Sequence, residues 1–403
     1  MNDNKQKIVV AGAGIVGTVQ ALLLAQAGYR VSLVDAASLP PPSSGLDVRS
    51  VALSYRSCQL LAGCGLWPEG GGCAINEVHV TERGKFGAVR LLARDLEVPQ
   101  LGAVIQNAVL EQHLTALVND CPDIELHQPA SAKVVSNTSQ GVSVQIQNSH
   151  EKYQMDAALL IAADGTFSKI RNDINIKTRT FDYQQHAVVA NLQCQRDHQN
   201  IAYERFTSSG PLALLPLGKR QMAMVYTVSS ADINTFKTCS DEEFLELLQQ
   251  SFGGKLGRFE ALGKRGVFPL ERVESQQQTN QQVILIGNAA RTLHPVAGQG
   301  LNLALRDVVE LSALLGKTDD LTTVAAEFVR ARASDQQSVV RMTDLLARVF
   351  RQQPWPVAIP VSMARSTALA VLDLVPLLRK RFGAASSGIG KPLANFSESQ
   401  TGS

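Results

Sequence analysis

The sequence has almost no excess of charge and no closely spaced pair of cysteines. Its 403 residues include 38 Lys and Arg against 36 Asp and Glu, a formal net charge of +2. This balance argues against nucleic-acid binding, which usually needs a clustered basic surface. The six cysteines form no CxxC pair and the seven histidines show no ligand spacing. We therefore expect no metal site and no dithiol redox centre, and the scattered thiols favour a reducing cytoplasm.

Two kinds of hydrophobic segment are also missing. The chain enters a strand-like run at Lys7, which leaves no room for a signal peptide. The longest apolar stretch, 355–378, contains Arg365, Asp373 and three prolines, so it predicts a surface element rather than a spanning helix. With 45% hydrophobic and 18% charged residues, the composition is typical of an ordinary globular protein.

A glycine-rich turn lies near the start of the chain, between an expected strand and an expected helix. It reads Gly12-Ala13-Gly14-Ile-Val-Gly17, and Asp35 ends the next expected strand. Gly12 permits a tight turn, Gly14 lets a pyrophosphate approach the backbone, and Gly17 lets the helix pack closely on the strand. An acidic residue at the position of Asp35 binds ribose hydroxyls. This motif predicts a dinucleotide-binding site.

Two later motifs also follow strand-like segments. One reads Ala163-Asp164-Gly165-Thr-Phe-Ser168-Lys-Ile-Arg171, and alone it is typical of an Asp-Gly turn. The other starts at Gly287-Asn288, crosses a His294-Pro295 loop and opens a long expected helix at Gly298-Gln-Gly300-Leu301-Asn302. A helix start offers unpaired N–H groups and the positive end of the helix dipole. It therefore suits a group that takes up negative charge.

Together the three motifs resemble those of the class A flavin monooxygenases of the p-hydroxybenzoate hydroxylase type. Within that class the chain is similar to the ubiquinone-biosynthesis hydroxylases, most of all to the branch that acts on 2-octaprenyl-6-methoxyphenol. The wider superfamily usually has Asp at the position of Asn288, whereas the quinone-pathway branch commonly has Asn. Three further segments carry the resemblance: Asp47-Val-Arg49-Ser-Val-Ala-Leu53, Val78-His-Val-Thr-Glu-Arg83-Gly84, and Glu204-Arg-Phe206 followed by Gly210-Pro211-Leu-Ala.

The resemblance implies an α/β fold. A Rossmann-like FAD-binding domain would be interrupted by an antiparallel-sheet substrate domain and followed by C-terminal helices. The expected FAD-binding domain comprises residues 1–72, 98–180 and 270–335. The expected substrate domain comprises residues 73–97 and 181–269. C-terminal helices are expected at 336–383, before a disordered tail at 384–403.

The resemblance also implies which residues bind the cofactor. The ADP half of FAD would meet Gly12, Ala13, Gly14, Gly17 and Asp35. Arg49 would contact the phosphates or the ribityl region, Asp164 and Gly165 would lie near the flavin, and Gly287 and Asn288 would meet the pyrophosphate and ribityl chain. Pro295 would line the flavin ring, and its pyrimidine side would receive backbone donors from Gly298, Gly300, Leu301 and Asn302.

The implied reaction is hydroxylation of a polyprenylated phenol, 2-polyprenyl-6-methoxyphenol, to the 1,4-benzoquinol in ubiquinone biosynthesis. NAD(P)H would bind transiently and reduce FAD, and O2 would then give a flavin C4a-hydroperoxide. Three alternatives stay open: another ring position of the same pathway, a small soluble aromatic substrate, and a flavin-binding scaffold subunit with little turnover. A small aromatic predicts a closed polar pocket with an Arg, whereas a prenyl chain needs an apolar channel.

Several residues have two interpretations. His294 is a candidate general base beside the flavin, but a structural role in fixing its loop is equally compatible with the sequence. Glu204 and Arg205 are interpreted as an ordinary solvated pair rather than as substrate contacts. The apolar and basic C-terminal segments fit either a capping helix pair or peripheral contact with the inner face of the membrane, or with ubiquinone-synthesis partners that present lipid.

Overall fold

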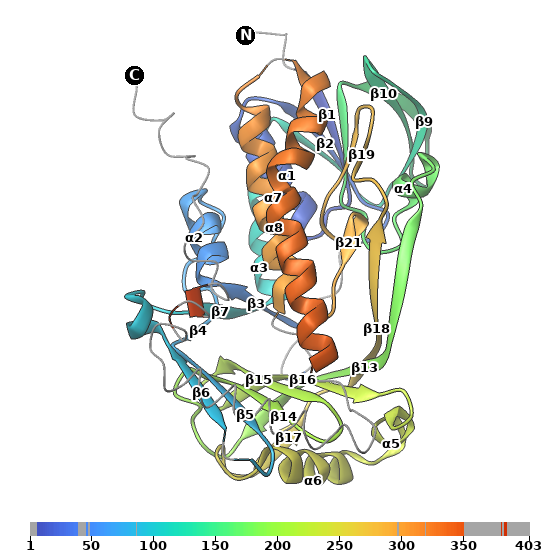
Figure 1. Ribbon diagram of the computed structural model, residues 1–403. Coiled ribbons are helices and arrows are strands. Elements are labelled where there is room, and N and C mark those ends of the chain that lie inside the picture. The colour runs from blue at the N-terminus through green and yellow to red at the C-terminus, as the bar shows by residue number, and fades with distance from the viewer. Residues whose placement is uncertain are drawn as a thin grey trace.

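The computed structural model describes residues 6–38, 46, 49–85, 87–295, 298–318, 320–349, 380 and 383–384. A six-stranded sheet forms the upper part of the molecule in Figure 1, and a nine-stranded sheet forms the lower part. The strands of the upper sheet are, in spatial order, β19 (Thr279–Asn280), β20 (Val283–Leu285), β12 (Leu159–Ala162), β1 (Lys7–Ala11), β2 (Arg30–Val34) and β8 (Ile124–His127). All pairs in this sheet are parallel except β19 with β20.

The central strands of the upper sheet are apolar on both faces because both faces are covered. Ile8 and Val10 of β1 pack into one core cluster, whereas Val9 and Ala11 pack into another. The helices that contribute to the first cluster are α1 (Ile15–Gln26), α2 (Tyr55–Gly63), α3 (Asn107–Asn119), α7 (Gln299–Leu315) and α8 (Leu321–Val349). The second cluster involves β9 (Ser131–Thr138), β10 (Gly141–Gln147), β11 (Lys152–Ala157) and the short helix α4 (Lys169–Asp173).

The nine-stranded sheet is antiparallel except for one parallel pair, β14 with β5. Its path is β21 (Arg291–Thr292), β18 (Gly266–Ser275), β13 (Thr178–Cys194), β16 (Gln221–Ser229), β15 (Pro211–Gly218), β14 (Ile201–Phe206), β5 (Glu77–Glu82) and β6 (Ala88–Leu92), with β17 (Phe259–Leu262) paired to β13. One face packs on α5 (Ile233–Thr238) and α6 (Asp241–Phe252). The long strands β13 and β18 run up to the first sheet (Figure 1).

A small sheet lies against the other face of the large sheet. It consists of β3 (Ser50–Ser54), β7 (Gly102–Gln106) and β4 (Cys73–Ile75), and two 3-10 turns, η1 (Ala93–Leu96) and η2 (Gly287–Ala289), complete the described elements. Ile75 and Val104 of the small sheet share a core cluster with Ala202 and Ala223 of the large sheet. The large sheet therefore lies between α5 and α6 on one face and the small sheet on the other.

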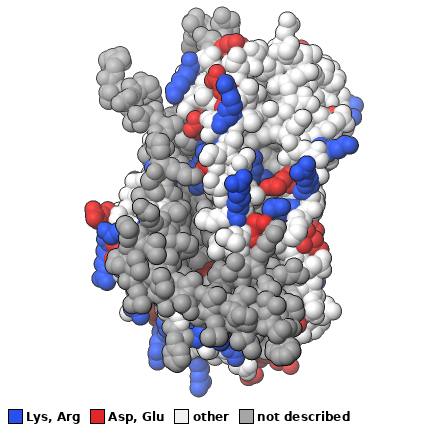
Figure 2. Space-filling model, in the orientation of Figure 1, with Lys and Arg blue, Asp and Glu red and all other residues white. Residues whose placement is uncertain are grey.

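The α/β fold class is confirmed, and the expected antiparallel sheet is present with one parallel pair that the sequence did not indicate. The helical pattern expected after Gly300 is present as two helices, α7 and α8, that reach Val349, while 350–379, 381–382 and 385–403 lie outside the described residues. Within the described residues, every helix is too short or too polar to cross a bilayer. Figure 2 shows Lys and Arg side chains lying among Asp and Glu over this side of the molecule, in keeping with the near-zero net charge.

Candidate active site

The three sequence motifs meet at one edge of the upper sheet. Strands β1, β12 and β20 are parallel neighbours, so their carboxyl ends lie side by side. Ala163 N–H donates to the carbonyl of Ala11 at 2.7 Å, and Ile286 N–H donates to the carbonyl of Ala162 at 2.9 Å. The residues that follow these strands, Gly12, Asp164 and Gly287, are therefore brought together from distant parts of the chain. In open parallel sheets, ligands bind at this edge.

The three glycines of the first motif serve different purposes. A Cβ on Gly12 would lie 2.4 Å from the carbonyl oxygen of Ala163, and its φ of +105° also disfavours a side chain. A Cβ on Gly17 would lie 1.8 Å from the carbonyl oxygen of Gly12. At Gly14 a Cβ would meet no heavy atom of the protein within 4 Å. Gly12 and Gly17 are thus required by packing, whereas Gly14 leaves open space over the start of α1.

The start of α1 fits an anionic group. No side chain caps its N-terminus and its first turn has no acidic residue, so backbone N–H groups are available there. Asp35 stands beside this turn, and its carboxylate accepts hydrogen bonds from Ala13 N–H at 2.5 Å and Ala37 N–H at 2.7 Å. The expected ribose-binding residue therefore also fixes the glycine turn to the end of β2.

Asp164 carries a buried polar atom that the protein leaves unsatisfied. Its Oδ2 accepts N–H groups from Lys169 at 2.8 Å and Ile170 at 3.2 Å, which anchors the start of α4. Its Oδ1 is buried and has no hydrogen-bond partner among the described residues. Buried acceptors are nearly always paired, so this atom fits a bound donor. It lies on the loop that Gly12 approaches most closely.

Arg171 joins the second motif to the third, a role that the sequence did not reveal. Its guanidinium donates to the carbonyl of Ala289 at 2.9 Å and to that of Thr166 at 2.8 Å. Ser168 caps α4 by accepting Arg171 N–H at 3.0 Å. Burial lowers the pKa of Arg171, although Asp164 opposes this change. The arginine thus holds the Asp164 loop and the η2 turn at a fixed separation. The Asn288 side chain on η2 remains exposed.

The start of α7 has no side-chain cap, and the N–H of its first flanking residue, Gly298, donates to the carbonyl of Pro295 at 2.9 Å. Gly298 adopts a left-handed φ of +58°, and a Cβ on Gly300 would meet nothing within 4 Å. Asn302 accepts Ser54 N–H at 2.8 Å and donates to the carbonyls of Gly298 at 2.7 Å and Ala52 at 3.3 Å. Its side chain therefore connects α7 to β3. The neighbouring Leu301 packs against the first core cluster of the upper sheet.

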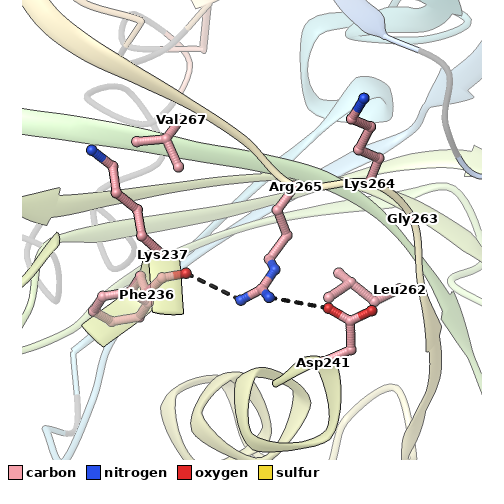
Figure 3. A pocket seen from close by; sticks show the side chains of 8 residues that line it. All are labelled: Phe236, Lys237, Asp241, Leu262, Gly263, Lys264, Arg265 and Val267. Carbon is pink, nitrogen blue, oxygen red and sulfur yellow. Dashed lines mark hydrogen bonds and ion pairs between the residues drawn. The ribbon is translucent and has the colours of Figure 1, made fainter. Parts of the chain in front are cut away.

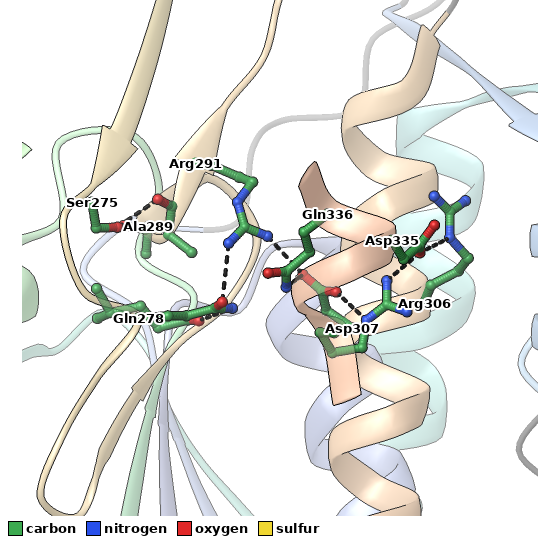
Figure 4. Close-up of polar contacts among 11 residues, drawn as sticks. Ser275, Gln278, Ala289, Arg291, Arg306, Asp307, Asp335 and Gln336 are labelled. Carbon is green, nitrogen blue, oxygen red and sulfur yellow. Dashed lines mark hydrogen bonds and ion pairs between the residues drawn. The ribbon is translucent and has the colours of Figure 1, made fainter. Parts of the chain in front are cut away.

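An ionic cluster links α7 to α8 (Figure 4). Arg332 on α8 contacts Asp307 at 2.6 Å and Asp335 at 2.6 Å, while Arg306 contacts Asp335 at 2.9 Å. Arg291, which follows η2, reaches Asp307 at 3.4 Å. Asp307 also accepts the side-chain amide of Gln336 at 3.0 Å. The cluster connects α7, α8 and the η2 loop, and so sets the position of the α7 N-terminus.

His294 is buried rather than presented to solvent. Its ring packs edge-on against Tyr183, with centroids 4.8 Å apart and planes at 81°, and only 2% of the residue is exposed. Burial lowers the pKa of His294 to about 4, although the nearby Asp344 opposes this change. A neutral, weakly basic ring favours the loop-fixing interpretation over proton abstraction. Pro295, the next residue, is exposed.

The buried state of His294 predicts a pH-dependent loss of stability. The pKa is about 4 in the native state and 6.5 when unfolded, so the unfolded chain binds more protons between these values and stability falls as the pH falls. The loss is about 2 kcal/mol at pH 5 and approaches about 3 kcal/mol near pH 4. The free-energy gap between wild type and His294→Gln, from denaturant unfolding, should therefore shrink by about 2 kcal/mol between pH 7.5 and pH 5. For His150→Gln, at an exposed position, the difference in unfolding free energy from the wild type should be the same at pH 7.5 and pH 5. The same pH-independent difference for His294→Gln would contradict the expectation.

Arg49, Glu204 and Arg205 lie at the large sheet. The guanidinium of Arg49, just before β3, lies 5.2 Å from the ring centroid of Phe268 on β18. The interpretation of Glu204 and Arg205 as a solvated pair is wrong. Arg205 points toward α6, where its Nε donates to the carbonyl of Ser251 at 3.0 Å. Adjacent residues of a strand point to opposite faces, so the half-buried Glu204 faces the small sheet instead.

The geometry fits one extended dinucleotide: open space at Gly14, two uncapped helix starts and an unsatisfied carboxylate oxygen at one sheet edge. The sequence matches the FAD binding domain family over residues 5–320. The chain belongs to this family. It is a class A, FAD-dependent aromatic monooxygenase, for which NAD(P)H and O2 are the typical co-substrates.

Two relatives place this monooxygenase among the ubiquinone-biosynthesis hydroxylases. It is 28% identical to the ubiquinone hydroxylase UbiL of Rhodospirillum rubrum, over 94% of this chain and 89% of that protein. It is 30% identical to 3-demethoxyubiquinol 3-hydroxylase of Escherichia coli, over 78% of this chain and 81% of that protein. Among solved structures, p-nitrophenol 4-monooxygenase PnpA from Pseudomonas putida has the same fold, with a TM-score of 0.74, 16% identity and coverage of 96% and 99%.

A separate pocket of about 730 Å³ opens on the large sheet of the monooxygenase (Figure 3). Its arginine, Arg265, is already engaged by the carbonyls of Phe236 and Cys239 and by Asp241 at 3.2 Å. None of the motif residues lines it. The lining residues are Phe236, Lys237, Asp241, Leu262, Gly263, Lys264, Arg265 and Val267.

Proposed function

We propose that this monooxygenase hydroxylates a polyprenylated phenol in ubiquinone biosynthesis, converting 2-polyprenyl-6-methoxyphenol to the 1,4-benzoquinol. One observation supports a prenylated substrate over a small aromatic acid. The face of the large sheet that is turned toward the FAD motifs is mainly apolar, and we call it the apolar face. Beyond the part on which the small sheet packs, its side chains include Ala213, Val225 and Val189, which are in register on neighbouring strands and only partly buried. An apolar wall suits a prenyl chain, because its burial is driven by the hydrophobic effect.

We propose that FAD lies along the carboxyl edge of the upper sheet. The pyrophosphate would sit over Gly14 at the start of α1, and Asp164 would accept a hydrogen bond through Oδ1. The backbone N–H groups of Gly300 and Leu301 would meet the pyrimidine side of the ring, where negative charge develops on reduction. When bound and reduced, FAD supplies the oxygen-transfer chemistry with O2; the protein supplies placement and exclusion of water.

A second ring position is the main alternative. The relative from Escherichia coli is named for hydroxylation of 3-demethoxyubiquinol, and its 30% identity exceeds that of the UbiL relative. Both candidate substrates carry a prenyl chain, so the apolar face supports either one. Product analysis separates them, because the oxygen is added at different ring carbons.

The test is turnover with purified, FAD-loaded protein. We expect NAD(P)H oxidation that depends on 2-polyprenyl-6-methoxyphenol and yields one hydroxylated product per NAD(P)H, with little turnover of hydroxybenzoates. Cells that lack the protein should accumulate the same phenol. Product from a demethoxyubiquinol instead would support the second ring position. If NAD(P)H is oxidised without a hydroxylated product, and cells that lack the protein have an unchanged quinone pool, the interpretation as a flavin-binding scaffold subunit is favoured.

The substrate also bears on where the enzyme works. A polyprenyl chain partitions into a bilayer, so we propose that the monooxygenase makes peripheral contact with a membrane surface. Flotation with phospholipid vesicles tests this contact: co-migration with vesicles supports it, and recovery of all the protein in the lipid-free fraction would refute it.

A further inference from the structure

One titratable side chain on the apolar face has no role in binding FAD. Glu204 lies on β14, where it is the register partner of Val80 on β5 and of Ala213 on β15. The row continues through Val225 and Val189. Residues in register across a sheet point to the same face. The carboxyl group of Glu204 is therefore set in a row of aliphatic side chains.

This face is joined to the region where the flavin ring is proposed to lie. Ala202, two residues before Glu204, packs in the core cluster that includes Ala52 and Leu215. Ala52 in turn would be 3.8 Å from a Cβ on Gly298, and its carbonyl accepts the Asn302 side chain. A substrate on this face would thus lie between the sheet and the start of α7.

Glu204 is not engaged by the protein itself. It is half-buried, and within the described part of the chain no hydrogen bond or ion pair to its side chain is present. Burial raises the pKa of Glu204 to about 7. A group with a pKa near 7 can both accept and return a proton under ordinary conditions.

Charged neighbours do not account for the raised pKa of Glu204. Strand β15 has no titratable residue, and on β5 the titratable residues are Glu77, His79 and Glu82. Glu82 shares the face of Glu204 but lies one row away, opposite Phe206. His79 points to the α6 side, where it contacts Lys255.

The small sheet that packs on the apolar face brings one further titratable residue, Cys73 on β4. Arg205 on β14 and Arg90 on β6 are the remaining cations of neighbouring strands. Arg205 lies on the α6 side. Arg90 is register partner of His79 and also lies there.

We propose that Glu204 contacts the phenol hydroxyl of the substrate and accepts its proton during hydroxylation. This inference rests on the proposed function. The phenol O–H bond breaks, a carboxyl O–H bond forms on Glu204, and the electron pair left on the phenol oxygen enriches the ring carbon that receives the oxygen atom. No electron is gained or lost in this step; the oxidant is O2 with reduced FAD, as in the proposed reaction. The proton returns to solvent after product formation.

The test compares Glu204→Gln with Glu260→Gln, the same chemical change on β17 at an exposed position of the same sheet. For the wild type, kcat should rise with pH through about 7, as the carboxylate forms. Glu204→Gln should lower kcat about 100-fold at pH 8 and abolish this rise. A ring-fluorinated substrate, whose phenol is more acidic, should recover part of the lost rate. Glu260→Gln should match the wild type throughout.

The outcomes separate the two proposals. If no prenylated phenol is turned over by the wild type, both fail. If the wild type is active and Glu204→Gln keeps its rate and its pH profile, only the role of Glu204 fails. A rate loss that the fluorinated substrate does not relieve also refutes proton transfer. If Glu204→Gln does not retain FAD, the proposal is tested with Glu204→Asp and with the pH profile of the wild type. A wild-type kcat that does not change from pH 6 to pH 8 contradicts the proposal.

Discussion

Replacing Asp307 by Asn is expected to destabilise the monooxygenase by about 3–5 kcal/mol and to release much of its FAD. In the wild type, three arginines share the carboxylates of Asp307 and Asp335 in a buried cluster. Burial lowers the pKa of Arg332, but Asp307 and Asp335 more than offset this and raise it. Removing the charge of Asp307 leaves the guanidinium groups of Arg332, which is buried, and of Arg291 and Arg306, which are largely buried, with Asp335 as the remaining carboxylate of the cluster. The uncompensated charge should separate α8 and the η2 loop from α7, whose start is proposed to meet the flavin.

The measurements are thermal unfolding with and without added FAD, and the ratio of flavin to protein after purification. Glu310→Gln is the matched control, because Glu310 lies one turn further along α7 and outside the cluster. We expect the control to retain wild-type stability and flavin content. If Asp307→Asn has the same melting temperature as this control, the ionic cluster contributes little to the stability of the protein.

Replacing Gly17 by Ala is expected to abolish FAD binding by breaking the packing beneath it. Its Cβ would lie 1.8 Å from the carbonyl oxygen of Gly12, a backbone atom, so α1 must move away from β1. Overpacking of this kind costs about 1–3 kcal/mol or more. Gly14→Ala should act differently, because its methyl group enters open space. It should leave the melting temperature of the apoprotein unchanged while weakening FAD binding about tenfold or more, or about 1.4 kcal/mol.

The pair of variants is informative because both add one methyl group to the same motif. Apoprotein stability comes from thermal unfolding and FAD affinity from quenching of flavin fluorescence. If Gly14→Ala binds FAD as tightly as the wild type, the pyrophosphate does not lie over Gly14. If Gly17→Ala keeps full stability, the close approach of α1 to Gly12 is not needed.

The local part of the site could be predicted from the sequence. Gly12, Gly14 and Asp35 follow a strand–turn–helix–strand pattern within thirty residues, and that pattern alone indicates a dinucleotide. The meeting of Asp164 and Gly287 at the same edge needed the family resemblance, because the sequence does not state that β12 lies between β1 and β20. Once the strand order is known, both positions follow.

The connections between motifs could not be predicted in this way. Arg171 binds the carbonyl of Ala289, 118 residues away, and a backbone carbonyl leaves no trace in the sequence. Asp307 lies on α7 and Arg332 on α8, 25 residues further along, and the packing of the two helices decides whether they meet. Glu204 and Arg205 are a different case. Strand alternation was sufficient to show that these neighbours face opposite sides, and therefore that they are not a pair.

The order of strands in the upper sheet has a consequence for biosynthesis. β1 is made first, but its second neighbour, β12, is complete only when residue 162 has been synthesised, and β12 in turn pairs with β20 at residues 283–285. The start of α7 follows later still, at Gln299. A nascent chain on the ribosome therefore has no complete flavin site until the residues at the start of α7 have been added. One edge of β1 stays unpaired until residue 162 has been synthesised, and one edge of β12 stays unpaired until residue 285, both within reach of molecular chaperones.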